Sequence, residues 1–260
     1  MPAFYDQLNR AVHVHQYPKR IISIVPSQTE LLFYLGLDDE IAGITKFCTH
    51  PHNKVRSKTK IGGTKQLNIE LIKELRPDLI IANKEENEQY QVEELMNICP
   101  VWISDIDDLP GALNMIESIG EVVGRLTQAK ALSQAIANEF NKLSNTPLNL
   151  RVAYLIWRKP YMAAGTGTFI NSMLQVCGLT NAFEQGRYPE VSNEMLIDAD
   201  PDVVLLSSEP YPFGEKHIAE IKHILPRAKI ILVDGEMFSW YGSRLLLAPA
   251  YFTSVIASIA

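Results

Sequence analysis

Apolar residues along the chain recur in two patterns, short β-branched runs and longer stretches with helical spacing. The run at residues 20–25 ends at Pro26 and predicts a strand, and the apolar positions after Ser27 predict a helix. Ser27 and Glu30 are spaced for a capping box at the start of this helix, and Gly36 is placed to end it. Strand and helix then alternate, which predicts a parallel sheet covered by helices on both faces.

The same two patterns continue to the C-terminal region. Further strands are predicted at 41–44, 79–82, 101–104, 151–156, 203–206 and 230–233, and further helices at 68–75, 91–98, 169–176 and 217–225. Because one alternating set lies in each half of the chain, we expect two α/β lobes.

The stretch 113–143 has apolar residues at three- and four-residue spacing and predicts the longest helix. Gly120 and Gly124 weaken its middle, and Thr127 offers a new cap, so a kink is expected there. The prediction is therefore an α/β protein of two lobes, each a mainly parallel sheet flanked by helices, joined by one long interlobe helix. The N-terminal lobe would span 1–110, the interlobe helix 111–146 and the C-terminal lobe 147–260.

An internal repeat links the two halves. Segments 68–83 and 192–207 share a glutamate, Glu70 or Glu194, then Pro-Asp seven residues later, then an apolar strand. Helix, Pro-Asp and strand are a frequent way to enter a parallel strand, which is one explanation. The alternative is that the lobes are equivalent and that each presents one acidic residue at a matching surface position.

Composition narrows the class of protein. The 260 residues are 47% apolar with a formal net charge of -6, which argues against nucleic acid or anionic lipid as a partner. Three scattered cysteines are too few for a disulfide framework, and their odd number leaves at least one free thiol. No apolar stretch approaches the roughly 20 residues of a membrane-spanning helix, and residues 1–20 lack the apolar core of a signal peptide. We expect either a cytoplasmic protein or a processed form whose leader was removed.

Motifs of common enzyme classes are absent from the sequence. It contains no Walker A loop, no Gly-x-Ser-x-Gly elbow, no HExxH and no paired CxxC. The segment 165–168 is only a weak match to a phosphate-binding loop. These absences weaken the common enzyme interpretations, and the resemblance described below implies a protein that is not an enzyme and requires no cofactor.

Candidate ligand groups follow several predicted strands, at the sheet edge where open α/β proteins bind ligands. The loop 46–52 contains Phe47, Cys48 and His50, whose thiolate and imidazole could bind a transition metal, contact a ligand without metal, or be structural. Glu85 follows the next strand, either in a solvated charge run or as a third metal ligand across the cleft.

Two segments of the second half bring aromatic and cationic side chains to one predicted edge. They contain Trp157, Arg158 and Tyr161 after one strand, and Trp240 and Arg244 after another. Flat aromatic rings and guanidinium groups suit a large planar or anionic ligand. Ordinary packing is the alternative explanation.

The ordered set of segments resembles the substrate-binding proteins of ABC importers for cobalamin, haem and ferric siderophores. Residues 20–31, 68–81, 177–179 and 191–206 carry the resemblance, which spans about Asp6 to the C-terminus. It implies two lobes joined by one helix, with Glu70 and Glu194 docking onto arginines of a two-fold symmetric membrane permease. His50 and Tyr188 match aromatic positions of cobalamin binders, whereas Thr64 and Asn83 stand where those proteins have tryptophans.

The resemblance implies a monomeric receptor, periplasmic or at the cell surface, that captures a metal chelate in the interlobe cleft for delivery to an ABC importer. The chelate would be a corrinoid such as cobalamin, haem or a ferric siderophore. Residues expected to face the cleft are Phe47, Cys48, His50, Glu85, Trp157, Arg158, Tyr161, Phe169, Tyr188, Trp240 and Arg244. Two alternatives remain: a metalloenzyme with a metal on Cys48 and His50, and a cytosolic binder of metal cofactors that has no permease.

Overall fold

The computed structural model describes residues 3–15, 17–143 and 147–259. The chain divides into two compact units, which we call unit 1 (residues 1–106, 110–135 and 241–244) and unit 2 (107–109, 136–240 and 245–260). The lobe boundaries expected near residues 110 and 146 stay a prediction, and positions 144–146 lie outside the described residues. Within the described part of the chain, every helix is too short or too polar to cross a bilayer.

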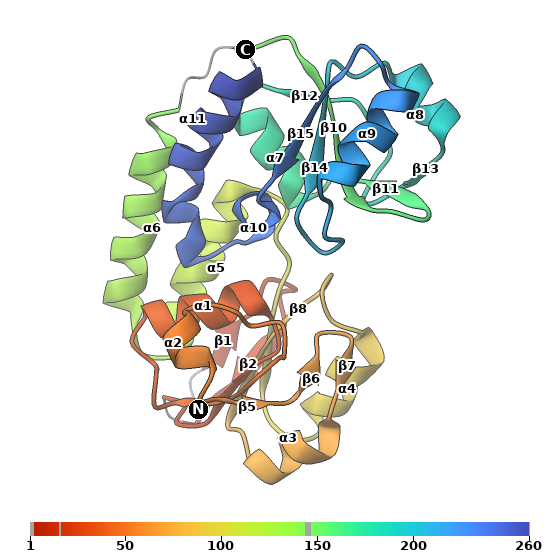
Figure 1. The fold of residues 1–260 in the computed structure, drawn as a ribbon. Coiled ribbons are helices and arrows are strands. Elements are labelled where there is room, and N and C mark those ends of the chain that lie inside the picture. Colours follow the sequence, from red (N-terminus) through yellow and green to blue (C-terminus); the bar gives the residue numbers. More distant parts are fainter. Residues whose placement is uncertain (1–2, 16, 144–146, 260) are drawn as a thin grey trace. The chain divides into compact units, whose positions relative to one another are not determined.

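Unit 1 is built on a five-stranded sheet in which every neighbouring pair is parallel (Figure 1). Its strands, in spatial order, are β5 (Thr59–Lys60), β4 (Ile41–Ile44), β3 (Ile21–Ser23), β8 (Leu79–Asn83) and β9 (Val101–Ser104). The connecting helices are α1 (Pro26–Tyr34), α2 (His52–Val55), α3 (Ile69–Leu75) and α4 (Gln89–Met96). Two antiparallel hairpins complete it, β1 (Ala3–Tyr5) with β2 (Ala11–His13) and β6 (Gly62–Gly63) with β7 (Gln66–Leu67).

The central strands of unit 1 form where β-branched residues are consecutive. Ile21 and Ile22 of β3 lie beside Leu79 and Ile80 of β8, and all four side chains are fully buried. Consecutive burial, rather than alternation, is what a parallel sheet covered on both faces requires. The predicted strands at 41–44, 79–82 and 101–104 are therefore confirmed.

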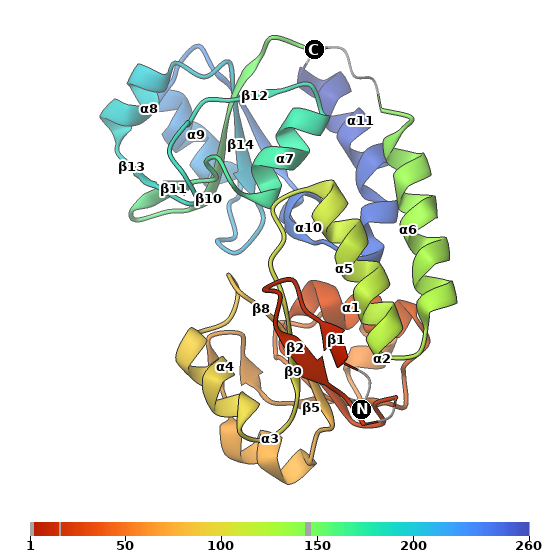
Figure 2. The same cartoon turned by 180° about the vertical axis from the view of Figure 1, so that it is seen from behind.

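The long helix predicted over 111–146 is wrong: two helices occupy this stretch, α5 (Leu109–Val122) and α6 (Leu126–Phe140). They lie side by side in Figures 1 and 2. Gly124 adopts a left-handed conformation at φ 70°, which ends α5 and turns the chain back. Gly120 lets the helices approach closely, because a Cβ at this position would overlap the Cβ of Ala129.

Unit 2 contains a six-stranded sheet. Its strands are β13 (Glu190–Val191), β11 (Tyr161–Ala163), β10 (Arg151–Trp157), β14 (Val203–Ser207) and β15 (Lys229–Val233) in spatial order, with β12 (Thr180–Asn181) also paired to β10. β12, β10, β14 and β15 are parallel, whereas β11 and β13 are antiparallel additions at the edge. The predicted strands at 151–156, 203–206 and 230–233 are confirmed.

Helices cover both faces of this second sheet, as Figures 1 and 2 both show. α8 (Asn193–Ala199) and α9 (Glu215–Ile224) lie on one face, and α7 (Phe169–Val176), α10 (Gly235–Ser239) and α11 (Ala248–Ile259) lie on the other. On the second face the Phe238 ring packs between Tyr154 and Phe252, with ring centroids 5.2 and 4.7 Å away. A short 3₁₀ helix, η1 (Ser243–Leu246), precedes α11.

The internal repeat recurs as the same local structure in each unit. α3 and α8 both have seven residues, and each begins after a side chain that accepts a hydrogen bond from the N–H three residues later, Asn68 at 3.0 Å and Ser192 at 3.2 Å. Each helix ends at a left-handed residue, Arg76 at φ 46° and Asp200 at φ 40°. The two helices therefore begin and end in the same way.

The Pro-Asp turns that follow are also alike. Asp78 accepts a hydrogen bond from the N–H of Arg20 at 3.0 Å, and Asp202 accepts one from the N–H of Arg151 at 2.8 Å. Each of these two guanidinium groups also donates to the carbonyl oxygen of the last residue of its own unit's helix. These matched contacts favour the alternative in which the two segments are equivalent parts of two similar units.

Candidate functional site

The first turn of α1 lies directly after β3, at the carboxyl edge of the unit 1 sheet. The capping box predicted for this helix is wrong, because Pro26 occupies the first turn, Val25 is the N-cap, and no side chain caps the helix. Gly36, at φ 76°, lies just beyond the C-cap Leu35, as predicted.

This turn and the start of η1 hold buried polar atoms that have no hydrogen-bond partner within the described part of the chain. Ser27 Oγ, Gln28 Oε1 and Ser243 Oγ are buried and unpartnered, and the three residues are 3%, 0% and 7% exposed. Gly242 brings the η1 segment against α1, because a Cβ there would lie 3.3 Å from the Ser27 carbonyl oxygen. Unsatisfied buried hydroxyls in a native structure indicate a missing partner such as water or ligand. The sequence pattern alone did not identify Ser27 and Ser243 as candidates.

Cys48 lies in a buried network of hydroxyl groups rather than in an open ligand position. Its Sγ lies 3.2 Å from Thr29 Oγ1 and 3.3 Å from Thr45 Oγ1, and the residue is 3% exposed. Burial raises the pKa of the thiol, which disfavours the thiolate that metal ligation needs. Across residues 3–15, 17–143 and 147–259, no group of three or more His, Cys, Asp or Glu side chains is arranged to hold a metal ion.

The loop after β4 places an aromatic and two imidazoles near the edge of the sheet. Phe47 is 52% exposed and packs against Gly63 of β6, while Lys46 Nζ lies 5.1 Å from its ring centroid. His50 is half-buried, and its ring lies 5.7 Å from that of His52. This part of the loop can offer aromatic surface and imidazole nitrogens to a ligand.

The loop after β8 is held by side-chain amides. Asn83 Oδ1 accepts from the N–H groups of Glu85 and Glu86 at 2.8 and 3.0 Å, and Asn87 Oδ1 accepts from the Asn83 N–H at 2.8 Å. The Tyr241 hydroxyl donates to Glu86 Oε1 at 2.8 Å. The half-buried Glu85 is thereby fixed at the carboxyl edge, where the sequence predicted it.

The sequence predicted Arg244 at the sheet edge of the second unit, but the structure places it in unit 1. Residues 241–244 return to unit 1, where Arg244 donates to both carboxylate oxygens of Glu30 at 3.0 and 2.8 Å. The arginine is 7% exposed. This bidentate pair within unit 1 leaves little charge for a ligand to meet.

In unit 2 an exposed tryptophan is followed in the chain by an arginine that is already paired with a carboxylate. Trp157, at the end of β10, is 40% exposed and packs edge-on against Tyr211, with ring centroids 5.7 Å apart. Arg158 pairs with Glu220, whose carboxylate lies 2.8 Å from the guanidinium and also accepts from the Tyr161 hydroxyl. Burial and this carboxylate raise the pKa of Tyr161 to about 12. Trp157 is therefore the open group, while Arg158 and Tyr161 are engaged with Glu220.

Trp240 and Glu209 form a second polar contact in unit 2. The Trp240 indole and the Ser239 hydroxyl both donate to Glu209 Oε1 at 2.8 Å. Burial raises the pKa of Glu209. No sequence pattern singles out this glutamate, which follows β14.

The other two predicted contacts of unit 2 differ in exposure. Phe169 is 4% exposed at the start of α7 and belongs to the core, whereas Tyr188 is half-buried in the loop before β13. The second therefore offers more surface to a ligand than the first.

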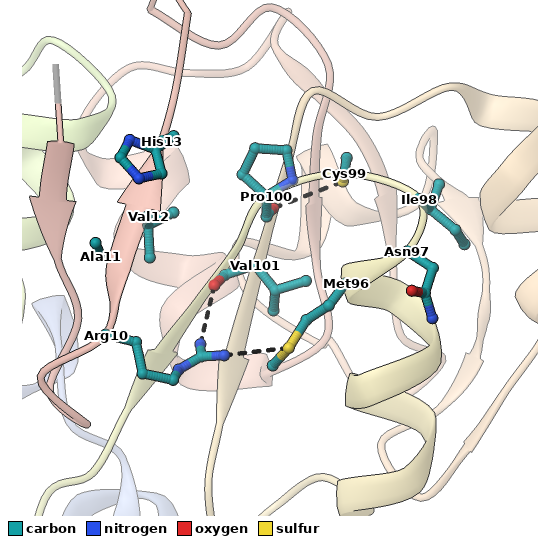
Figure 3. A pocket seen from close by; sticks show the side chains of 10 residues that line it. All are labelled: Arg10, Ala11, Val12, His13, Met96, Asn97, Ile98, Cys99, Pro100 and Val101. Carbon is teal, nitrogen blue, oxygen red and sulfur yellow. Dashed lines mark hydrogen bonds between the residues drawn. The ribbon is translucent and has the colours of Figure 1, made fainter. Parts of the chain in front are cut away.

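A pocket of about 430 Å³ in unit 1 is lined by other residues than these (Figure 3). It is bounded by Arg10, by the hairpin strand β2 and by the turn at 97–100 that leads into β9. The turn precedes β9, so the pocket lies at the amino edge of the sheet. None of the residues predicted to contact ligand lines it.

Comparison with known proteins places the chain in a family. The profile of the periplasmic binding protein family matches residues 21–225. A vitamin B12-binding protein of Pectobacterium carotovorum is 24% identical over 260 residues, covering 94% of this chain and 90% of that protein. The uncharacterized ABC transporter substrate-binding lipoprotein YvrC of Bacillus subtilis is 26% identical over 259 residues, with 93% and 81% covered.

The solved structures show the same fold. The periplasmic vitamin B12 binding protein BtuF of Vibrio cholerae superposes with a TM-score of 0.76 at 22% identity, covering 94% of this chain and 98% of that chain. Since the family profile spans well over half of its residues, this chain belongs to the periplasmic binding protein family.

Proposed function

We propose that this chain is the substrate-binding protein of an ABC importer and that its ligand is a metal chelate. The chelate class is a corrinoid such as cobalamin, haem or a ferric siderophore. The chain would bind and deliver this ligand without chemical change, so the proposed role is that of a receptor. Family membership and the names of the relatives, which include vitamin B12-binding proteins and a substrate-binding lipoprotein, support the proposal.

One observation carries the proposal, the matched placement of Glu70 and Glu194. Both are exposed, both occupy the first turn of a seven-residue helix, and both helices continue through the same Pro-Asp turn. Two equivalent carboxylates suit a partner that is itself two-fold symmetric, with one cationic site per subunit. A permease dimer is such a partner, and a single copy of this chain would supply both contacts.

The proposed ligand contacts are the exposed aromatic groups at the carboxyl edges of the two sheets. Phe47 in unit 1 and Trp157 in unit 2 are 52% and 40% exposed, and such surfaces stack well on planar macrocycles. His50, Glu85 and Tyr188 would add polar contacts.

The two arginines expected to meet the ligand are engaged elsewhere. Arg158 is neutralised by Glu220 and Arg244 by Glu30. Apart from Glu85, a ligand would therefore meet mainly neutral donors and acceptors, including the hydroxyls of Ser27 and Ser243, and would find both of these arginines paired. This chemistry favours a corrinoid with amide side chains over a strongly anionic chelate.

The proposed location is the outer side of the cell membrane, either in a periplasm or on a lipid-anchored surface protein. Importers take their ligand from that side, and the family is named for it. A cytosolic cofactor binder remains the competing proposal and predicts no dependence on a permease.

Uptake by cells tests the proposal. Cells lacking this chain should lose high-affinity uptake of the chelate and regain it with the wild-type chain. The E70K/E194K double variant should fail to restore uptake, while an E93K/E139K control with the same change in charge restores it. Restoration by the E70K/E194K variant would refute docking and favour the cytosolic alternative.

A further inference from the structure

The structural match between α3 and α8 makes individual positions of the two helices comparable. The glutamates stand at the same place in each helix, and so do the residues one turn later, Lys73 and Ile197. Residues three apart lie on the same face of a helix, so each of these side chains neighbours its own glutamate. We call Glu70 with Lys73 the α3 docking face and Glu194 with Ile197 the α8 docking face. The first carries a cation beside the carboxylate, and the second carries an apolar side chain.

The carboxylate on α3 already has an internal partner. Lys73 Nζ lies 2.7 Å from Glu70 Oε1 and 3.7 Å from Glu94 Oε1. The hydrogen bond that Lys73 donates to the Glu70 carboxylate raises the pKa of Lys73, which keeps the ammonium charged. A cation on a partner protein must compete with Lys73 for Glu70.

The carboxylate on α8 has no such competitor. Among the described residues, no lysine or arginine lies within ion-pair distance of Glu194. Hydrogen bonds from the Ser192 hydroxyl and from its own backbone N–H lower the pKa of Glu194, which keeps it ionised. Ile197, one turn away, is 53% exposed.

We infer that the two docking faces are unequal and that the α8 face is the stronger. Its occupant is a permease surface that places a guanidinium or ammonium group against Glu194 and an apolar side chain against Ile197. On the α3 face the same cation would displace Lys73 and so gain less. This inference rests on the proposed docking role and adds which face dominates and which two residues set the difference.

Reciprocal substitutions between the two helices test this directly. Right-side-out membrane vesicles are prepared from source cells lacking this chain. They are incubated with wild-type chain that carries fluorescein at its N-terminal amine. Unlabelled variants then compete, and the concentration that displaces half of the label is measured. The probe is the chain itself, so the assay does not depend on which chelate is transported.

We expect K73I to compete two- to fivefold better than wild type, because exposed ion pairs are weak and their removal frees Glu70. I197K should compete about tenfold worse, since it places an internal cation beside Glu194 and removes the apolar contact. E194Q should weaken competition at least tenfold and E70Q no more than about threefold.

A matched control comes from a pair outside the docking faces. Lys142 Nζ lies 2.5 Å from Glu139 Oε1, also three residues away, so K142I repeats the K73I change at an unrelated site and should leave competition unchanged. Equal effects of E70Q and E194Q, or no gain from K73I, would overturn the inequality while leaving docking intact. If wild-type chain does not bind the vesicles saturably, both this inference and the proposed function fail.

Discussion

The ion pair between Arg244 and Glu30 makes a strong prediction, because it closes a contact between residues 214 positions apart. The arginine side chain is 8% exposed and the glutamate side chain 18% exposed, and both belong to unit 1. Replacing Arg244 with methionine keeps most of the side-chain volume but leaves a largely buried carboxylate without its partner. Unit 1 should therefore lose stability.

The expected loss follows from the geometry. Two charge-assisted hydrogen bonds at 2.8 and 3.0 Å are removed, and the remaining carboxylate stays desolvated. Removing one partner of a buried pair costs about 3–5 kcal/mol, whereas an exposed pair contributes about 0.2–1 kcal/mol. Since the arginine is nearly inaccessible, we expect about 3 kcal/mol for R244M. The E30M/R244M double variant should recover part of this, because it removes the unpaired charge.

Urea unfolding measures these costs separately for unit 1. Trp102 is fully buried in that unit, while Trp157 and Trp240 belong to unit 2. In a W157F/W240F background, tryptophan fluorescence therefore reports on unit 1 alone. The four corners of the cycle are this background, E30M, R244M and the double variant.

Two results would contradict a buried, coupled pair of Arg244 and Glu30. A loss below about 1 kcal/mol for R244M would mean that Arg244 and Glu30 behave as an exposed pair in solution. Additive losses in the double variant would mean that the two side chains are not coupled.

Two further predictions concern packing and pH. In G120A the new methyl group would overlap Ala129, so we expect the free energy of unfolding to fall by about 1–3 kcal/mol despite the better helix propensity of alanine. The control G186A, whose Cβ would meet open space, should stay near wild type in thermal unfolding. An unchanged melting temperature for G120A would contradict the close approach of α5 and α6. Burial raises the pKa of Cys99 and Cys177 to about 12 from an ordinary 9.0, so the native state holds these protons to higher pH than the unfolded state. Their contribution to stability is complete below pH 9 and is lost as the pH rises towards 12, by up to about 1.4 kcal/mol per pH unit for each thiol. Between pH 9 and 12 the urea midpoint of C99A/C177A should fall less steeply with pH than that of wild type. Parallel pH curves would contradict the raised pKa of these two thiols.

Local sequence patterns predicted the central strands of both sheets, because each is an apolar run bounded by turn residues. The short strands β5, β11, β12 and β13 were not predicted, since two or three residues form no such run. The strand predicted at 79–82 is β8 at Leu79–Asn83, and the one at 203–206 is β14 at Val203–Ser207. The Pro-Asp turns before both runs fix where the strands begin.

The errors in the helices have local physical causes. Apolar spacing is the same before and after a chain reversal, so the pattern over 113–143 did not distinguish one helix from two; the left-handed Gly124 decides it. No helix was predicted at the C-terminal end, where the structure has α11; its Pro249 lies in the first turn, where proline is tolerated.

The site depends on partners that are distant in sequence. Arg158 follows a strand, as predicted, but its charge is taken up by Glu220, 62 residues later. The sequence identified the right kind of side chain at the right edge of the sheet. It did not show which of these side chains are already paired.

Chelate binding is tested by an equilibrium titration of the purified chain with cyanocobalamin, cobinamide, haemin and ferric siderophores. Tryptophan fluorescence is the readout, and free tryptophan is the control for light absorption by the ligand. We predict saturable one-to-one quenching by one chelate, with an affinity at least about tenfold lower in W157A, because this variant removes the aromatic side chain that would stack on the ligand. Absence of saturable binding by all of these chelates, with the chain folded, would contradict the proposed function.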